Sequence, residues 1–225
     1  PDSSPVLDML DAEGAPYMLI YNQPGARGRP TVTVDNVAAG REVAERLAAL
    51  GHRRLGMVAG PTRLSDRAAA RSAGFAEGAQ AAGLAPPALA EVDFVSLETQ
   101  SALDPLFADR AAAPTALFCS NDLLAITAIG ALSRMGLRAP EDVSVIGFDG
   151  IAVGARMRPL LATVAQPSRE MGRLAAQSVL DRLKGGAPPQ TAVLPHSLRL
   201  GGSAGPAGKQ RPAEPPQRSN QRATP

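Results

Sequence analysis

The chain has 225 residues, of which 44% are hydrophobic and only 3% aromatic, and its formal net charge is +2. This length and composition allow one large or two small globular lobes, whose core must be built from Ala, Leu, Val and Ile. The single cysteine, Cys119, excludes an internal disulfide, no Cys and His spacing indicates zinc, and no apolar run has the length of a membrane span. We therefore expect no metal, no cofactor and no membrane association.

The basic residues are concentrated near the C-terminus. Residues 203–225 hold four basic side chains against one acidic side chain, a net charge of +3, which leaves −1 for the rest of the chain. Because this segment is rich in Pro, Gly, Gln and Ser, we expect residues 204–225 to form a disordered basic tail. The remaining chain shows no basic stripe of the kind that binds nucleic acid.

The first part of the chain alternates between helix and strand. Asp35 and Asn36 can cap a helix on which Val43 and Leu47 recur at helical spacing, and Gly51 is placed to end it. The elements predicted here are helix 6–14, strand 17–21, loop 22–30, strand 31–35 and helix 37–50.

The alternation continues through the middle of the chain. Leu124, Ala128 and Leu132 form the apolar stripe of one helix, which Gly136 closes. The predicted elements are strand 55–59, helix 66–82, strand 90–94, helix 99–110, strand 115–119, helix 122–135 and strand 143–148. Such regular β–α alternation with short links predicts an α/β fold with a parallel, doubly wound sheet.

After Asp149 this rhythm changes. Residues 159–167 begin and end with proline, which suits an extended segment that passes between two lobes. Helix 168–184 follows, and then two short strands at 191–194 and 197–200. This order suggests that the chain returns to a first lobe and then crosses back.

Polar side chains stand at the ends of two predicted strands. Asn121 and Asp122 follow strand 115–119, and Asp149 ends strand 143–148. In an open α/β sheet the carboxyl ends of the strands open onto the ligand crevice. We therefore expect these side chains to hydrogen-bond a small polar ligand, and capping of the next helix is an alternative role for Asn121 and Asp122.

Seven sequence blocks carry a specific resemblance, in order and at matching spacing. They are Val34–Asn36 with Gly40, Leu50–Gly56, Gly60–Pro61, Arg71–Phe75, Pro114–Phe118 with Asn121–Asp122, Gly136–Asp149, and Leu161–Pro167 with Met171–Gly172. Over residues 5–203 the chain resembles the effector-binding domain of the LacI/GalR family of bacterial transcriptional regulators.

The resemblance implies a periplasmic-binding-protein-like architecture, in which two doubly wound parallel-sheet lobes are joined by three crossings. On this basis residues 1–35 and 168–195 form an incomplete N-terminal lobe, and residues 36–167 and 196–203 form the C-terminal lobe. The resemblance also implies a homodimer that reads operator DNA through a helix-turn-helix. Since the chain opens at Pro1 without such helices, we expect that its front end is missing.

The resemblance assigns ligand contacts to further residues. Arg71 would clamp ligand oxygens with its planar guanidinium, and Phe94 would stack on a sugar or a base. Gln166 would contact the ligand from a crossing, and Tyr21 and Asn22 would form the opposite wall. The alternatives are a solvated helix arginine for Arg71, a core residue for Phe94 and a backbone partner for Gln166.

These features predict a ligand sensor and not an enzyme. The chain has no Gly-x-Ser-x-Gly elbow, no Walker or dinucleotide fingerprint, and no catalytic set around His52 and His196. An Asp122 and Asp149 pair of the glycosidase type is the enzymatic alternative. We expect a cytoplasmic regulator that binds a small polar effector, in the first place a sugar. A periplasmic sugar-binding protein that serves a transporter is the alternative function.

Overall fold

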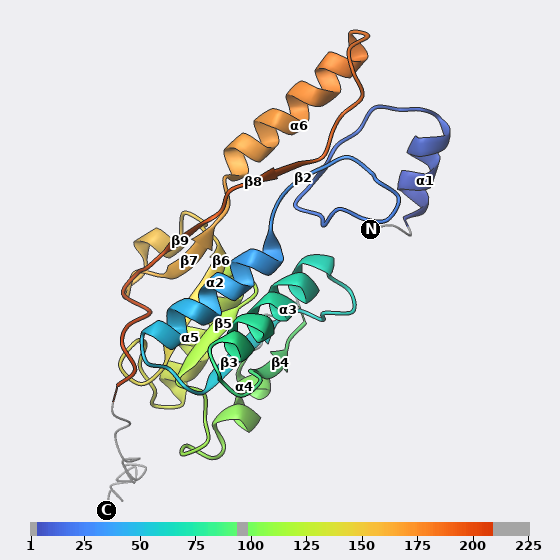
Figure 1. The fold of residues 1–225 in the computed structure, drawn as a ribbon. Helices are drawn as coiled ribbons and strands as arrows, with labels where there is room; N and C mark the ends of the chain where they lie inside the picture. The colour runs from blue at the N-terminus through green and yellow to red at the C-terminus, as the bar shows by residue number, and fades with distance from the viewer. Residues whose placement is uncertain (1–3, 94–98, 209–225) are drawn as a thin grey trace, which may run out of the picture.

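In a computed structural model the described residues, 4–93 and 99–208, form two β-sheets in separate parts of the molecule (Figure 1). The smaller sheet has the strand order β1-β2-β8, with β1 (Leu19–Ile20), β2 (Thr31–Val34) and β8 (Ala192–Leu194). The larger sheet has the order β4-β3-β5-β6-β7-β9, with β3 (Leu55–Ala59), β4 (Ala88–Glu91), β5 (Ala116–Cys119), β6 (Ser144–Asp149), β7 (Ala162–Ala165) and β9 (Ser197–Arg199). Neighbouring strands are parallel except for β7 and β9, which are antiparallel.

Helices cover both faces of the larger sheet. The helices in the described part of the chain are α1 (Pro5–Ala12), α2 (Asn36–Ala49), α3 (Asp66–Ala81), α4 (Gln100–Phe107), α5 (Asp122–Arg134), the short 3-10 helix η1 (Gly154–Arg156) and α6 (Ser168–Leu183). On one face Phe75 of α3 shares a buried core with Phe118 of β5. On the other face Leu124 of α5 is buried with Leu117 of the same strand. Because successive strand residues point to opposite faces, this arrangement is the predicted doubly wound α/β fold.

The chain passes between the two sheets three times, from β2 to α2, from β7 to α6 and from β8 to β9. α6 packs on the smaller sheet, where Met171 and Val32 are fully buried. Figure 1 shows α6 alongside β8 and β2, with α1 to one side of them. The smaller sheet therefore has its own core, joined to the larger sheet by these crossings.

Three predicted elements differ from the structure. The predicted strand 17–21 is reduced to β1, which pairs only with β2. The predicted strand 90–94 is instead β4, which ends at Glu91 because its neighbour β3 ends at the paired residue Ala59. Residues 159–167 are extended as predicted, but they also contain β7, which joins the larger sheet by pairing with β6 on one side and β9 on the other.

Residues 204–208 pack against the part of the chain that carries the larger sheet. The N–H of Ala207 donates to the carbonyl oxygen of Leu50 (2.8 Å), and the N–H of Gly205 donates to a serine hydroxyl of β6 (3.0 Å). The prediction that a disordered tail begins at residue 204 is therefore wrong for this stretch, because backbone hydrogen bonds hold it. Residues 209–225 lie outside the described residues.

Helices α2 and α3 approach each other closely at two glycines. A Cβ atom on Gly74 would lie 2.0 Å from the carbonyl oxygen of Val37, and one on Gly40 would lie 2.3 Å from the carbonyl oxygen of Arg71. Since no side chain fits at such distances, glycine is required at both positions. This contact fixes α3 rigidly against α2.

A buried histidine connects the starts of two strands with the C-terminal segment. His52 is only 2% exposed, and its Nδ1 lies 2.9 Å from Thr115 Oγ1. Its Nε2 lies 3.1 Å from both Ser144 Oγ and the carbonyl oxygen of Gly205. Burial lowers the pKa of His52 below the usual 6.5.

This lowered pKa predicts a pH-dependent contribution to stability. The stability that neutral His52 contributes is fully present above the unfolded pKa of 6.5 and is lost as the pH falls toward the lower folded value. Unfolding by urea at several pH values between about 8 and 5 should show that the wild type loses up to about 1.4 kcal/mol per pH unit relative to His52→Gln. Parallel pH profiles of the two proteins would contradict this assignment.

Candidate functional site: a cleft between the two sheets

A cleft of about 810 Å³ lies where the two sheets face each other. Tyr21 follows β1 of the smaller sheet, whereas Asp149 and Gln166 stand at the ends of β6 and β7 in the larger sheet. The other lining residues are Arg67, Gly150, Ile151, Ala152, Pro167, Ser168, Arg169 and Glu170. Pockets that bind small molecules typically measure about 300–1,000 Å³, so the volume suits such a ligand.

Asp149 is the carboxylate of this cleft. Its Oδ1 accepts a hydrogen bond from Gln166 Nε2 (2.8 Å), and its backbone φ is +117°, a strained value for a residue with a side chain. Burial raises the pKa of Asp149, while the charge of Arg71 and the bond from Gln166 lower it less strongly. Strained and desolvated polar residues of this kind are concentrated at binding sites.

Gln166 has an acceptor that the protein leaves unused. Its amide nitrogen donates to Asp149, but its buried Oε1 has no hydrogen-bond partner among the described residues. Buried polar atoms usually have partners, and an unsatisfied one is a position that a ligand donor can fill. The carboxylate of Asp149 is thus the acidic acceptor of the cleft, and the amide oxygen of Gln166 is buried beside it.

Arg71 lies beneath the cleft and does not line it. Its Nε donates to Asn36 Oδ1 (2.7 Å), its Nη1 donates to the carbonyl oxygen of Ser120, and its guanidinium carbon lies 3.5 Å from the centre of the Phe148 ring. Burial lowers the pKa of Arg71 to about 10, despite the nearby charge of Asp149. The Arg71 guanidinium therefore remains charged at neutral pH, and it packs against Phe148 near the end of β6.

Asp122 is fully buried, and its two oxygens have protein partners. Oδ1 accepts from Thr163 Oγ1 (2.6 Å) and Oδ2 from the N–H of Ile151 (2.8 Å). Burial raises the pKa of this carboxyl group. Asn121 caps α5, because its side chain accepts from the N–H of Leu124 (2.8 Å). Both residues position the floor of the cleft, and their direct contact with a ligand stays a prediction.

The loop after Asp149 requires glycine. Gly150 has a φ of +75°, and a Cβ atom there would lie 2.7 Å from the Cβ of Ala165. Its N–H points toward Thr163 Oγ1 at 3.3 Å. The loop therefore brings backbone groups of residues 150–152 to the cleft surface, where a side chain on residue 150 would block the close approach.

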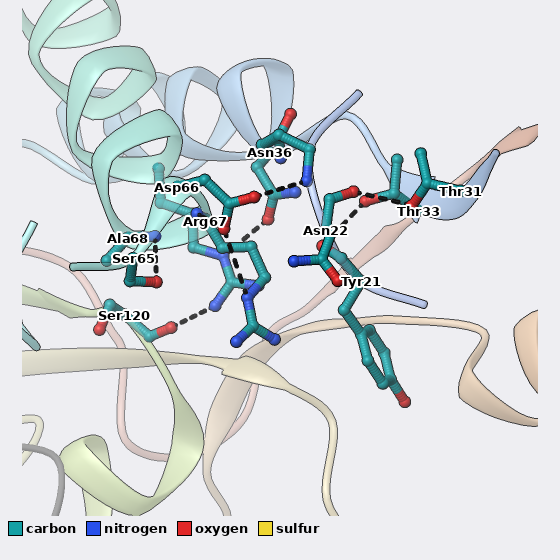
Figure 2. Close-up of polar contacts among 12 residues, drawn as sticks. Tyr21, Asn22, Thr31, Thr33, Asn36, Ser65, Asp66, Arg67, Ala68 and Ser120 are labelled. Carbon is teal, nitrogen blue, oxygen red and sulfur yellow. Dashed lines mark hydrogen bonds and ion pairs between the residues drawn. The ribbon is translucent and has the colours of Figure 1, made fainter. Parts of the chain in front are cut away.

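The opposite wall is the loop after β1 (Figure 2). Tyr21 has a φ of +75° and lines the cleft, and its carbonyl oxygen accepts from Thr33 Oγ1 (3.2 Å). The carbonyl oxygen of Asn22 accepts from Thr31 Oγ1 (3.1 Å). The structure therefore places Tyr21 at the cleft, whereas Asn22 is outside the lining set. Phe94 lies outside the described residues.

The ligand contacts predicted from the sequence do not include Arg67 or the residues that begin α6. Arg67 lies one helical turn before Arg71 on α3, a spacing that places both on one helix face, and only Arg67 reaches the cleft surface. Ser168, Arg169 and Glu170 line the cleft because β7 delivers the start of α6 there. No polar pattern distinguishes these three residues in the sequence.

The part of the chain that the structure describes offers no group of three or more His, Cys, Asp or Glu side chains suited to a metal ion. Within residues 4–93 and 99–208, no helix combines the length and the apolar character that a bilayer crossing needs.

Comparison with known proteins identifies the family of this chain. The sequence profile of the periplasmic binding protein-like domain matches residues 44–204, which is most of the chain. The chain belongs to this family. The match spans the larger sheet, the cleft residues on its side and α6.

The relatives of this periplasmic binding protein-like domain are LacI-family regulators. The repressor CytR of Escherichia coli K12 is 36% identical over 158 residues, which are 69% of this chain and 46% of CytR. The chain thus spans about half the length of this relative. CytR and similar relatives are transcriptional regulators, and the chain is a LacI-type effector-binding domain.

Solved structures agree with this assignment. A LacI-family regulator from Enterococcus faecium with bound ribose superposes with a TM-score of 0.79 at 26% identity, over 89% of this chain and 74% of that one. A complex of the regulator CelR with cellobiose has a TM-score of 0.78 at 31% identity, over 90% of this chain and 63% of that one. These similarities confirm the predicted periplasmic-binding-protein-like fold.

Proposed function

We propose that this domain senses a small polar effector, in the first place a sugar, held in the cleft between the two sheets. The single observation that carries the proposal is that one cleft of suitable volume is lined from both sides, by Tyr21 of one part and by Asp149 and Gln166 of the other. A ligand that touches both parts binds their alternative arrangements with different affinity, and so shifts the equilibrium between them.

The chemistry of the cleft favours a neutral, hydroxyl-rich molecule. Asp149 is an acceptor for hydroxyl donors, and Arg67 is a donor for ring or hydroxyl oxygens. The ring of Tyr21 offers an apolar face for the C–H face of a sugar. That two similar regulators hold ribose and cellobiose supports a sugar as the ligand class.

We further propose that residues 1–35 with 168–195 form one lobe, and that residues 36–167 with 196–208 form the other. Support comes from the membership of the two sheets and from the hydrogen bonds of residues 204–208. Rotation of the lobes on effector binding would change the spacing of the two DNA-binding domains in a homodimer. This change in spacing would alter the affinity of the homodimer for operator DNA. Such a protein would act in the cytoplasm and release its effector unchanged.

The test is calorimetric titration of the chain with pentoses, hexoses, disaccharides and nucleosides. At least one sugar should bind, and Asp149→Asn should weaken it by about tenfold to a hundredfold, because an ionised acceptor is lost while the bond from Gln166 can persist. Asp104→Asn, on the exposed surface of α4, is the matched control and should bind like the wild type. Equal affinity of wild type and Asp149→Asn for the sugar would place the ligand elsewhere.

A further inference from the structure

The loop formed by residues 21–23 is held from two directions. The threonine side chains of β2 hold its first two carbonyl groups from within the smaller sheet. A third bond comes from the other side of the cleft, where the N–H of Gln23 donates to Asp66 Oδ2 (2.9 Å). Figure 2 shows Asp66 at the end of α3, facing the loop that carries Tyr21 and Asn22. This bond joins the parts of the chain that carry the two sheets.

Asp66 is well fixed on its own side. It is the first residue of α3, where a negative charge is favoured by the helix dipole, and its side chain is 21% exposed. Its Oδ1 accepts from the N–H of Arg67 (2.8 Å), which leaves Oδ2 for Gln23. The tight contact of α3 with α2 at Gly74 makes this helix a rigid support.

We propose that Asp66 is a clasp that sets the width of the cleft. By holding residues 21–23 against α3, it holds Tyr21 at the position where this residue lines the cleft, and so it is a positioning residue. Chain crossings between two packed units act as hinges. A hydrogen bond between the units at a point away from these hinges restrains the rotation of one unit relative to the other. Loss of this one acceptor therefore favours the arrangement in which the two units stand further apart.

The clasp also affects affinity, and this consequence rests on the proposed function. An effector that bridges the cleft binds the narrow arrangement, so its apparent affinity falls in proportion to the population of that arrangement. Asp66 does not line the cleft, but its Oδ1 lies 4.0 Å from Nε of Arg67, which does. A change in affinity on its substitution therefore reports on cleft geometry when the distance between the two units changes with it.

The clasp can be tested without any ligand by measuring a distance between the two units. Spin labels on Gln80→Cys of α3 and Lys184→Cys after α6 occupy exposed positions, whereas the native Cys119 is buried and burial raises its pKa, so it stays unlabelled. In pulsed electron resonance, Asp66→Ala should reduce the short-distance population by about threefold to tenfold. Asp66→Asn, which keeps an acceptor oxygen, should restore the wild-type distribution.

The matched control is Glu77→Ala, which removes an exposed acid from the same helix and breaks its ion pair with Arg41 of α2. Its distance distribution should equal that of the wild type. If Asp66→Ala fails to fold, Gln23→Pro removes the donor N–H instead and should lengthen the distance in the same way. Unchanged distances in the folded donor or acceptor variant, or an equal change in Glu77→Ala, would overturn the clasp.

Titration of the same variants with the sugar that the wild type binds separates the two proposals. Asp66→Ala should bind it about threefold to tenfold more weakly, and Asp66→Asn should bind it like the wild type. If the wild type binds no sugar but the distances change as expected, the proposed function is wrong and the clasp is supported. If the wild type binds a sugar but Asp66→Ala leaves the distances unchanged, the clasp is wrong and the proposed function is supported.

Discussion

Replacing Gly74 with alanine should destabilise the domain by about 3 kcal/mol or more, because a backbone shift is the only way to relieve the clash. The new Cβ would lie 2.0 Å from the carbonyl oxygen of Val37, and backbone atoms cannot move aside as a flexible side chain can. In a domain of this size such a loss lowers the melting temperature by about 6–12 °C. Thermal unfolding followed by circular dichroism would measure it.

The control for this prediction is Gly172→Ala in α6. A Cβ atom at Gly172 would meet nothing within 4 Å, and its φ is not in the left-handed region. Because alanine is the better helix former, this variant should be more stable than the wild type by about 0.5–1 kcal/mol. Similar melting temperatures for the two variants would show that α2 and α3 do not pack as closely as described.

Arg71→Ala should cost about 3 kcal/mol of folding free energy in the absence of any ligand. The substitution leaves Asn36 Oδ1 and the carbonyl oxygen of Ser120 without their donor in a buried place, and it removes the guanidinium from the Phe148 ring. The removal of a desolvated charge offsets part of this cost. Urea unfolding of the ligand-free protein would measure the difference.

Arg41→Ala is the comparison for this experiment. Arg41 is half exposed and pairs with Glu77 on the neighbouring helix, so its loss should change stability by no more than about 1 kcal/mol. If Arg71→Ala unfolds at the same urea concentration as the wild type, Arg71 is not the buried support of β6 that its contacts describe.

Much of this fold could be predicted from hydrophobic patterning and helix stop signals. Strand 55–59 was predicted at its observed bounds, and Gly136 follows the end of α5 with the positive φ of a helix stop. The strand-end argument placed Asp149 at the cleft, because the carboxyl ends of parallel strands share one edge. These features depend on local periodicity, which a single sequence contains.

The burial of individual polar residues could not be predicted in this way. Asp122 follows β5 as expected and Arg71 lies on a helix as expected, but tertiary partners such as Thr163 and Asn36 occupy their polar atoms. The start of α6 reaches the cleft only because β7 crosses back from the larger sheet. Such long-range contacts leave no periodic signal along the chain.

If residues from both parts of the chain hold one ligand in one cleft, both walls should respond to the ligand together. Hydrogen exchange of the domain, with and without a bound sugar, tests it most directly because it reports on each backbone segment. Bound sugar should slow exchange on both walls together, at residues 19–22 and at residues 149–152. Protection confined to one wall, or found only on surfaces away from the cleft, would contradict it.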